Sequence, residues 1–360
     1  MGNKVGEADV NMSEAVKPLL DTELKNTKVV FKGPLELDYE TAGVDWNPDG
    51  GLALIRTEYS LISPGTELAL YTGTHVGLPD PANKFAKYPF YPGYSIVGRI
   101  AAVGSEVTEF RPGDRIYTIG RHAAYNTVDT QALTVPLLKL SDSRLDEKAA
   151  FARLAAISMT SVMQTDFRIG DTVVVIGMGL IGNLAAQLYM LQGARVIAVD
   201  VVDKRLQTAH ETGIEHTILS GSGVDLNERV KQITGGLLPD VVVEATGSPQ
   251  LVVPALQLVR ELGQVIALGS TRGHVDLNVY EYIHRKGVRY TGAHEALQNN
   301  KRFTSRLELT RYVLSMIGQG ALKVNPLLTH RLAYTEAKLG YEMLLHQQDQ
   351  ALGVLLEWTK

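Results

Sequence analysis

The sequence predicts an α/β protein in which a β-rich barrel domain, built from both ends of the chain, holds an inserted doubly wound parallel sheet. Three observations indicate this fold class: short strand-like runs before residue 146, a strand–helix alternation from 170 to 293, and the loss of that alternation afterwards. A chain of 360 residues, 45% of them hydrophobic, is long enough to form two cores.

The first half of the chain is typical of a compact antiparallel barrel. Alternating or β-branched runs are separated by Gly and Pro, which place turns between strands. The clearest runs cover residues 52–60, 95–104, 114–120 and 127–136.

The middle of the chain is typical of a parallel sheet with helices on both faces. Residues 146–167 carry apolar side chains at helical spacing after an acidic start, which predicts a helix. Continuously apolar runs then alternate with helical segments, as buried parallel strands do. We expect strands at 172–177, 194–200, 216–220, 240–247, 263–269 and 288–293.

After residue 293 the alternation stops. Helices are expected at 301–318 and 335–346, and a final strand at 351–358. Because this tail no longer follows the strand–helix pattern, we expect it to complete the first domain. The predicted domains are therefore residues 1–155 completed by 300–360, and residues 156–299.

The composition excludes several functions. Basic and acidic side chains, 35 and 39 in number, are mixed along the chain, so no basic surface for nucleic acid or an anionic membrane is expected. Cysteine is absent, which excludes disulfides, thiolate metal ligands and cysteine nucleophiles. The N-terminal residues lack the apolar core of a signal peptide, and no apolar run is long enough to span a membrane. We expect a cytoplasmic protein with a small-molecule substrate.

A glycine motif follows the first strand of the parallel sheet. Gly177, Gly179 and Gly182 have the G-x-G-x-x-G spacing, and Leu180 and Ile181 lie where the next helix opens. In a dinucleotide site these glycines permit a tight turn, close approach of the pyrophosphate and close helix–strand packing. Glycines also occur in structural turns, but the order strand, glycines, helix and strand favours a cofactor site.

The second strand of the sheet ends at Asp200, about 20 residues after the motif, where a carboxylate binds the adenosine ribose. A carboxylate there accepts hydrogen bonds from both ribose hydroxyls and repels the 2′-phosphate of NADP. The nearby Arg205 either softens that repulsion or lines the adenosine edge. The pattern favours NAD over NADP.

With these motifs the chain resembles the medium-chain dehydrogenase/reductase superfamily. The resemblance also includes the segments EATGSP (244–249), LGS (268–270) and LLTHR (327–331). It implies a GroES-like barrel domain and a Rossmann domain, with the cofactor in the cleft between them. It also implies that the following residues lie near the cofactor: Thr160, Thr246, Gly247, Gly269, Ser270 and His294.

The chain departs from the zinc-dependent members at each metal position. Ser63 stands where the family has a ligand Cys, Tyr94 where it has a ligand His, and Ala156 at the expected third position. A hydroxyl, a phenol and a methyl do not hold Zn²⁺, which takes nitrogen, thiolate or carboxylate ligands. The segments around Ser63 and Tyr94 resemble the zinc-free branch, with bacteriochlorophyllide dehydrogenase-like and alcohol/polyol dehydrogenase-like members, and no metal site is expected.

Without a metal, side chains must move the substrate proton. We expect Tyr94 to donate a hydrogen bond to the substrate oxygen, and His122 or Thr66 to pass the proton to solvent, with Ser63 beside them. The opposing interpretations are that Tyr94 fills the vacated ligand position and that His122 is an exposed loop residue.

These observations favour a zinc-independent, NAD-dependent oxidoreductase acting on a secondary alcohol or ketone, including polyols and cyclitols. One alternative is an enoyl or quinone reductase that uses NADPH. Another is a nucleotide-binding protein without catalytic activity. The superfamily frequently pairs through the edge of the Rossmann sheet, so a homodimer formed by the strand at 288–293 is expected.

Overall fold

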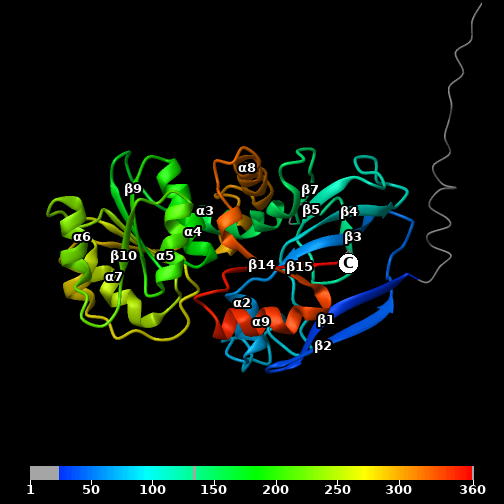
Figure 1. Ribbon diagram of the computed structural model, residues 1–360, viewed down its shortest axis with the longest axis horizontal. Coiled ribbons are helices and arrows are strands. Elements are labelled where there is room, and N and C mark those ends of the chain that lie inside the picture. The colour runs from blue at the N-terminus through cyan, green and yellow to red at the C-terminus, as the bar shows by residue number, and fades with distance from the viewer. Residues whose placement is uncertain (1–23, 133–134, 359–360) are drawn as a thin grey trace, which may run out of the picture.

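The computed structural model describes residues 24–132 and 135–358, and these residues form two regions along the long axis (Figure 1). The N-terminal residues on which the signal-peptide prediction rests lie outside the described residues. A strand–helix region lies at one end, a β-rich region lies at the other, and α8 lies between them. The predicted fold class is confirmed.

The strand–helix region is built on a parallel sheet in the order β10-β9-β8-β11-β12-β13. Its central strands are largely apolar because helices cover both faces, as the buried Val173, Val174 and Val175 of β8 show. The predicted strands are all present, each within a few residues of its expected bounds. They are β8 Thr172–Ile176, β9 Arg195–Asp200, β10 His216–Leu219, β11 Val241–Glu244, β12 Gln264–Ala267 and β13 Arg289–Gly292.

Most helices of this region follow the carboxyl ends of the strands, whereas the first two helical elements precede the first strand. The expected helix at 146–167 is divided into a 3₁₀ turn and a shorter α-helix. The helical elements are η1 Asp146–Phe151, α3 Ala152–Met163, α4 Leu180–Leu191, α5 Asp203–Glu211, α6 Leu226–Thr234, η2 Pro249–Leu251, α7 Val252–Leu258 and η3 Tyr280–His284.

The β-rich region contains a sheet in the order β14-β15-β3-β4-β5-β7, with β6 also paired to β3. The C-terminal strand β15 pairs antiparallel with β3, Leu355 opposite Leu61, so the tail returns to the first region as expected. The domain bounds themselves remain a prediction. The strands are β3 Leu52–Leu61, β4 Ile96–Val103, β5 Arg115–Thr118, β6 Tyr125–Asp129, β7 Leu137–Lys139, β14 Leu328–Ala333 and β15 Gly353–Glu357.

Several elements were not predicted. The hairpin of β1 (Lys25–Gly33) and β2 (Glu36–Gly43) was not predicted because β2 has few apolar side chains and none of its residues is buried. The short helix α2 (Thr66–Tyr71) was not predicted either. In the tail the two expected helices are present as α8 Arg306–Gly318 and α9 Ala337–His346, whereas the 3₁₀ turns η4 Glu295–Asn299, η5 Asn325–Leu327 and η6 Tyr334–Glu336 were not predicted.

One apolar core runs across the boundary between the regions. It joins Leu61, Val97 and Tyr117 of the β-rich sheet to side chains of α3, α4 and β8. The two regions are therefore packed against each other through a shared apolar core.

Candidate active site

The glycine motif has the local geometry that a dinucleotide site requires. Gly177 has a φ of +96°, and a Cβ there would lie 2.6 Å from Cγ2 of Thr246. A Cβ on Gly182 would lie 1.7 Å from the carbonyl oxygen of Gly177, so helix α4 touches the loop directly. Gly179 is the N-cap of α4 and has open space beside it. The positive end of the helix is therefore accessible to a phosphate group.

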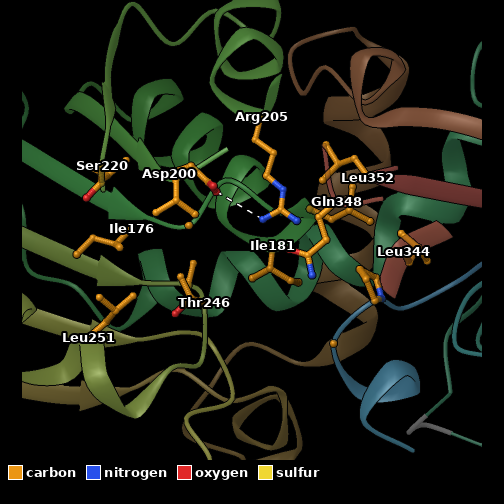
Figure 2. A pocket seen from close by; sticks show the side chains of 18 of the residues that line it. Ile176, Ile181, Asp200, Arg205, Ser220, Thr246, Leu251, Leu344, Gln348 and Leu352 are labelled. Carbon is orange, nitrogen blue, oxygen red and sulfur yellow. Dashed lines mark ion pairs between the residues drawn. The ribbon is translucent and has the colours of Figure 1, made fainter. Parts of the chain in front are cut away.

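Asp200 lies at the end of β9 and is 5% exposed. Its carboxylate accepts hydrogen bonds from the backbone N–H groups of Met178, at 2.6 Å, and Val202, at 2.9 Å. These bonds orient the carboxylate toward the cleft and leave lone pairs on both oxygens. Arg205 reaches over from α5, with Nη1 3.7 Å from Oδ2 of Asp200. Figure 2 shows the two side chains pointing toward each other in the pocket.

Asp200 and Arg205 line a cavity of about 500 Å³, here called the Asp200 section of the cleft. Leu180 and Ile181 form part of its wall, as expected from the sequence. The β-rich region supplies the opposite wall, where Figure 2 shows Leu344, Gln348 and Leu352. The section therefore lies between the two regions of the chain.

A second cavity of about 310 Å³, here called the Tyr94 section, continues the cleft. The two sections share Pro64, Gly65, Ile181, Ala245 and Thr246, so they form one continuous groove. Predicted residues that line the Tyr94 section are Ser63, Thr66, Tyr94, Thr246, Gly247, Gly269, Ser270 and His294. The structure thus brings together residues that lie far apart in the sequence.

The hydroxyl of Tyr94 donates to Oε2 of Glu295 at 3.0 Å. The guanidinium carbon of Arg153 lies 4.4 Å from the centre of the Tyr94 ring, and Arg153 also pairs with Glu295. Burial raises the pKa of Tyr94 well above its usual range; Arg153 opposes this rise and Glu295 adds to it. Tyr94 lines the cleft as expected, and its donation to a substrate oxygen stays a prediction, which requires that the hydroxyl exchange its bond to Glu295 for one to the substrate.

The assignment of Ala156 to the third metal-ligand position is corrected. Ala156 is 1% exposed and belongs to the apolar core, so its side chain does not face the cleft. The α3 residue beside Tyr94 is Arg153, nearly one helical turn earlier. Within residues 24–132 and 135–358, no group of three or more His, Cys, Asp or Glu side chains could hold a metal ion.

The interpretation of His122 as a proton carrier in the cleft is wrong. Its ring is fully buried and lines neither section of the groove. Nδ1 lies 2.7 Å from Oγ of Ser60 and Nε2 lies 3.1 Å from Oε2 of Glu67. Tyr341 donates to the same Glu67 oxygen and Trp358 donates to Ser60. His122 is therefore part of a polar network inside the β-rich region.

Thr160 is likewise buried and lines neither section. Its hydroxyl lies 2.6 Å from the carbonyl oxygen of Ile157 and 3.2 Å from that of Ala293. Ala293 lines the Tyr94 section, so Thr160 supports the wall of the cleft from behind rather than forming it.

Three charged residues of the site were not predicted: Arg153, Arg272 and Glu295. Arg272 and Glu295 line the Tyr94 section, and Arg153 lies directly behind it. A signal for two of them was present, because Arg272 follows the end of β12 and Glu295 follows the end of β13. Ligands bind at the carboxyl ends of parallel strands. Arg153 carried no such signal, because its helical segment is almost entirely apolar.

Comparisons with known proteins identify the family of the chain. Residues 49–140 match the family of the alcohol dehydrogenase GroES-like domain, and residues 181–309 match the zinc-binding dehydrogenase family. An uncharacterized zinc-type alcohol dehydrogenase-like protein of Escherichia coli (strain K12), YdjJ, is 27% identical over 92% of this chain and 99% of its own. Sorbitol dehydrogenase of Bacillus subtilis (strain 168) is 30% identical over 60% of this chain and 67% of its own.

Solved structures show the same fold. A protein of Escherichia coli CFT073, described as a short chain alcohol dehydrogenase complexed with NADH, is 19% identical and has a TM-score of 0.77. The match covers 92% of this chain and 99% of that one. The chain belongs to the medium-chain, zinc-type alcohol dehydrogenase-like family of NAD(P)-dependent oxidoreductases. Among the described residues no helix is long and apolar enough to cross a membrane.

Proposed function

We propose that the chain is a zinc-independent dehydrogenase that transfers a hydride between NAD(H) and a secondary alcohol or ketone of the polyol or cyclitol class. The observation that carries this proposal is the continuous groove from Asp200 to Tyr94. One end of the groove has the features of a nicotinamide dinucleotide site. The other end is a polar pocket with few side chains that could bind a metal ion.

Asp200 supports the choice of NAD. Two backbone donors hold its carboxylate, each oxygen can accept a further hydrogen bond, and Asp200 lines the groove, where ribose hydroxyls can donate to it. A 2′-phosphate at the same place would meet the buried negative charge. Arg205 offsets part of this charge, but it approaches Asp200 from one side only.

The side chains around Tyr94 support zinc independence. Although relatives are named as zinc-type, this chain offers a hydroxyl at Ser63, a phenol at Tyr94 and a guanidinium at Arg153. The carboxylate of Glu295 is engaged by that guanidinium. A divalent cation here would lack its preferred ligands and would be repelled by a buried positive charge.

The groove suggests how the chain's own residues act. The glycine loop and the start of α4 hold the pyrophosphate, and Thr246, Gly247, Gly269 and Ser270 form the wall where the Tyr94 section meets the cofactor site. NAD, when bound, accepts or returns the hydride. Ser63 and Thr66 lie in the same section, and their hydroxyls are available to hydrogen-bond the substrate oxygen.

A substrate screen tests the proposal. Purified protein is assayed by nicotinamide absorbance with NAD⁺ or NADP⁺ against D-sorbitol, xylitol, erythritol, myo-inositol and 2-butanol, and in reverse against the corresponding ketones. Oxidation of a polyol or cyclitol with NAD⁺, by protein that contains no stoichiometric zinc in elemental analysis, is the expected result. NADPH-dependent reduction of C=C bonds would support a reductase instead, and NADH binding without any turnover would indicate an inactive nucleotide-binding protein.

We also propose a homodimer. Strand β13 lies at the edge of the parallel sheet, and its Tyr290 is 40% exposed. An uncovered edge strand presents unpaired backbone groups that a second copy can satisfy.

A further inference from the structure

The Tyr94 section contains a carboxylate that no sequence motif pointed to. Glu295 is the first residue of η4, directly beyond the carboxyl end of β13, and its side chain is 25% exposed. Among the described residues that line this section, Glu295 is the one acidic side chain. It therefore lies where a substrate bound next to the nicotinamide would meet it.

Two side chains hold one oxygen of this carboxylate. Tyr94 donates to Oε2 from the segment before β4, and Arg153 donates to the same oxygen from α3. No described residue is hydrogen-bonded to Oε1, and this oxygen is not buried without a partner. The arrangement leaves Oε1 available to a ligand in the groove.

Arg153 needs Glu295 because it is itself only 7% exposed. A buried guanidinium is costly unless a counterion and hydrogen bonds compensate it, and the Tyr94 ring supplies a further cation–π contact. The other titratable groups that face this cluster are Arg306 of α8, Tyr117 of β5 and His294 beside Glu295. Positive charge thus prevails around Glu295.

The oxidation of an alcohol releases a hydride from carbon and a proton from oxygen. The hydride leaves with its electron pair to the nicotinamide, and the C–O bond becomes C=O as the O–H bond breaks. Tyr94 is a poor proton acceptor because it is neutral and already donates, and Arg153 carries no acceptor. A carboxylate with one free oxygen can take that proton and pass it to water in the groove.

We propose that Glu295 is the catalytic base of this oxidation and the acid of the reverse reaction, with Tyr94 and Arg153 as positioning residues that aim its carboxylate. This inference rests on the proposed dehydrogenase function and names the residue that moves the proton. Glu295, which follows the carboxyl end of β13, thus takes the proton-transfer role that was expected of His122 or Thr66.

The main test is Glu295→Gln, which keeps the shape of the side chain and removes its basicity. For the polyol that wild-type protein oxidises best, kcat/KM should fall by roughly 10²–10⁴-fold, the usual contribution of a positioned acid–base group. The dissociation constant of NADH, measured by fluorescence, should stay within about twofold. The acid limb of the pH profile of kcat/KM should disappear. Glu281→Gln, on the exposed turn η3, is the matched control and should change none of these values.

The positioning residues are tested by the pH profile. Arg153→Met removes the cation beside the carboxylate, so the acid limb should move to higher pH. Arg153→Lys keeps the positive charge and should return the acid limb close to its wild-type position. Tyr94→Phe should lower kcat and displace the acid limb less than Arg153→Met does. If Glu295→Gln does not fold, as judged by thermal melting, Glu295→Asp replaces it; this variant should keep the acid limb and lose kcat.

The outcomes separate the two proposals. If wild-type protein oxidises none of the alcohols in the screen, the dehydrogenase proposal fails and this inference fails with it. If wild-type protein is active and Glu295→Gln retains its kcat/KM and its acid limb, the dehydrogenase proposal stands and the role of Glu295 is wrong. A loss of melting temperature with an unchanged acid limb would show that Glu295 serves only as the counterion of Arg153.

Discussion

Replacing Asp200 by Asn should weaken the preference of the protein for NAD(H). The amide keeps the size of the side chain but removes its charge and one acceptor oxygen. In the wild-type structure the two oxygens accept from Met178 and Val202 and keep lone pairs for the ribose hydroxyls. The variant therefore loses a hydrogen bond to a charged group in the bound state.

The magnitude follows from the kind of bond that is lost. A hydrogen bond to a charged partner contributes about 1.5–3 kcal/mol, so the dissociation constant of NADH should rise about 10- to 150-fold. For NADPH the removed repulsion at 4 Å is worth about 1 kcal/mol in bulk water and about 4 kcal/mol near a protein surface, so NADPH should bind at least about fivefold more tightly. Arg205, 3.7 Å from Asp200, then becomes free to pair with the 2′-phosphate.

The assay is a fluorescence titration of the protein with NADH and with NADPH at fixed ionic strength. Asp203→Asn, a neighbouring exposed position at the start of α5, is the control and should leave both dissociation constants unchanged. Tighter binding of NADPH than NADH by wild-type protein would refute the reasoning. An equal loss of affinity for NADH and NADPH in Asp200→Asn would also refute the reasoning, because it would indicate that the substitution had damaged the glycine loop.

Three further outcomes are expected. Gly182→Ala places a methyl group against the carbonyl oxygen of Gly177, so α4 must shift. The free energy of unfolding, measured by melting, should fall by about 1–3 kcal/mol. The affinity for NADH, measured by titration, should fall at least tenfold. His122→Phe leaves buried polar partners unsatisfied and should cost about 1–3 kcal/mol in urea denaturation without changing NADH affinity; an active-site role would instead show as lost turnover at unchanged stability. Sedimentation at micromolar concentration should give a dimer, and Tyr290→Lys on the edge strand β13 should shift the species toward monomer; a wild-type monomer would contradict the assembly.

The sequence alone determined the features that depend on neighbouring residues. The glycine triplet, the strand before it and Asp200 after it predicted the Asp200 section, because chain geometry at the end of a parallel strand is local. The alternation of apolar runs and helices likewise predicted the strands of the parallel sheet, whose buried faces require apolar residues. The return of the C-terminal tail was predicted for a similar reason, since the strand–helix pattern ends before it.

The tertiary structure decided which polar side chains face the groove. His122 and Tyr94 both follow glycine-containing loops, yet one is enclosed by Ser60 and Glu67 and the other borders the cleft. Likewise, an apolar helix can turn either Arg153 or Ala156 toward Tyr94, and only its packing selects Arg153. These outcomes depend on contacts between segments that are far apart in the chain. A local pattern specifies how the backbone folds, but the partner of a buried charge is known only when all the elements have packed together.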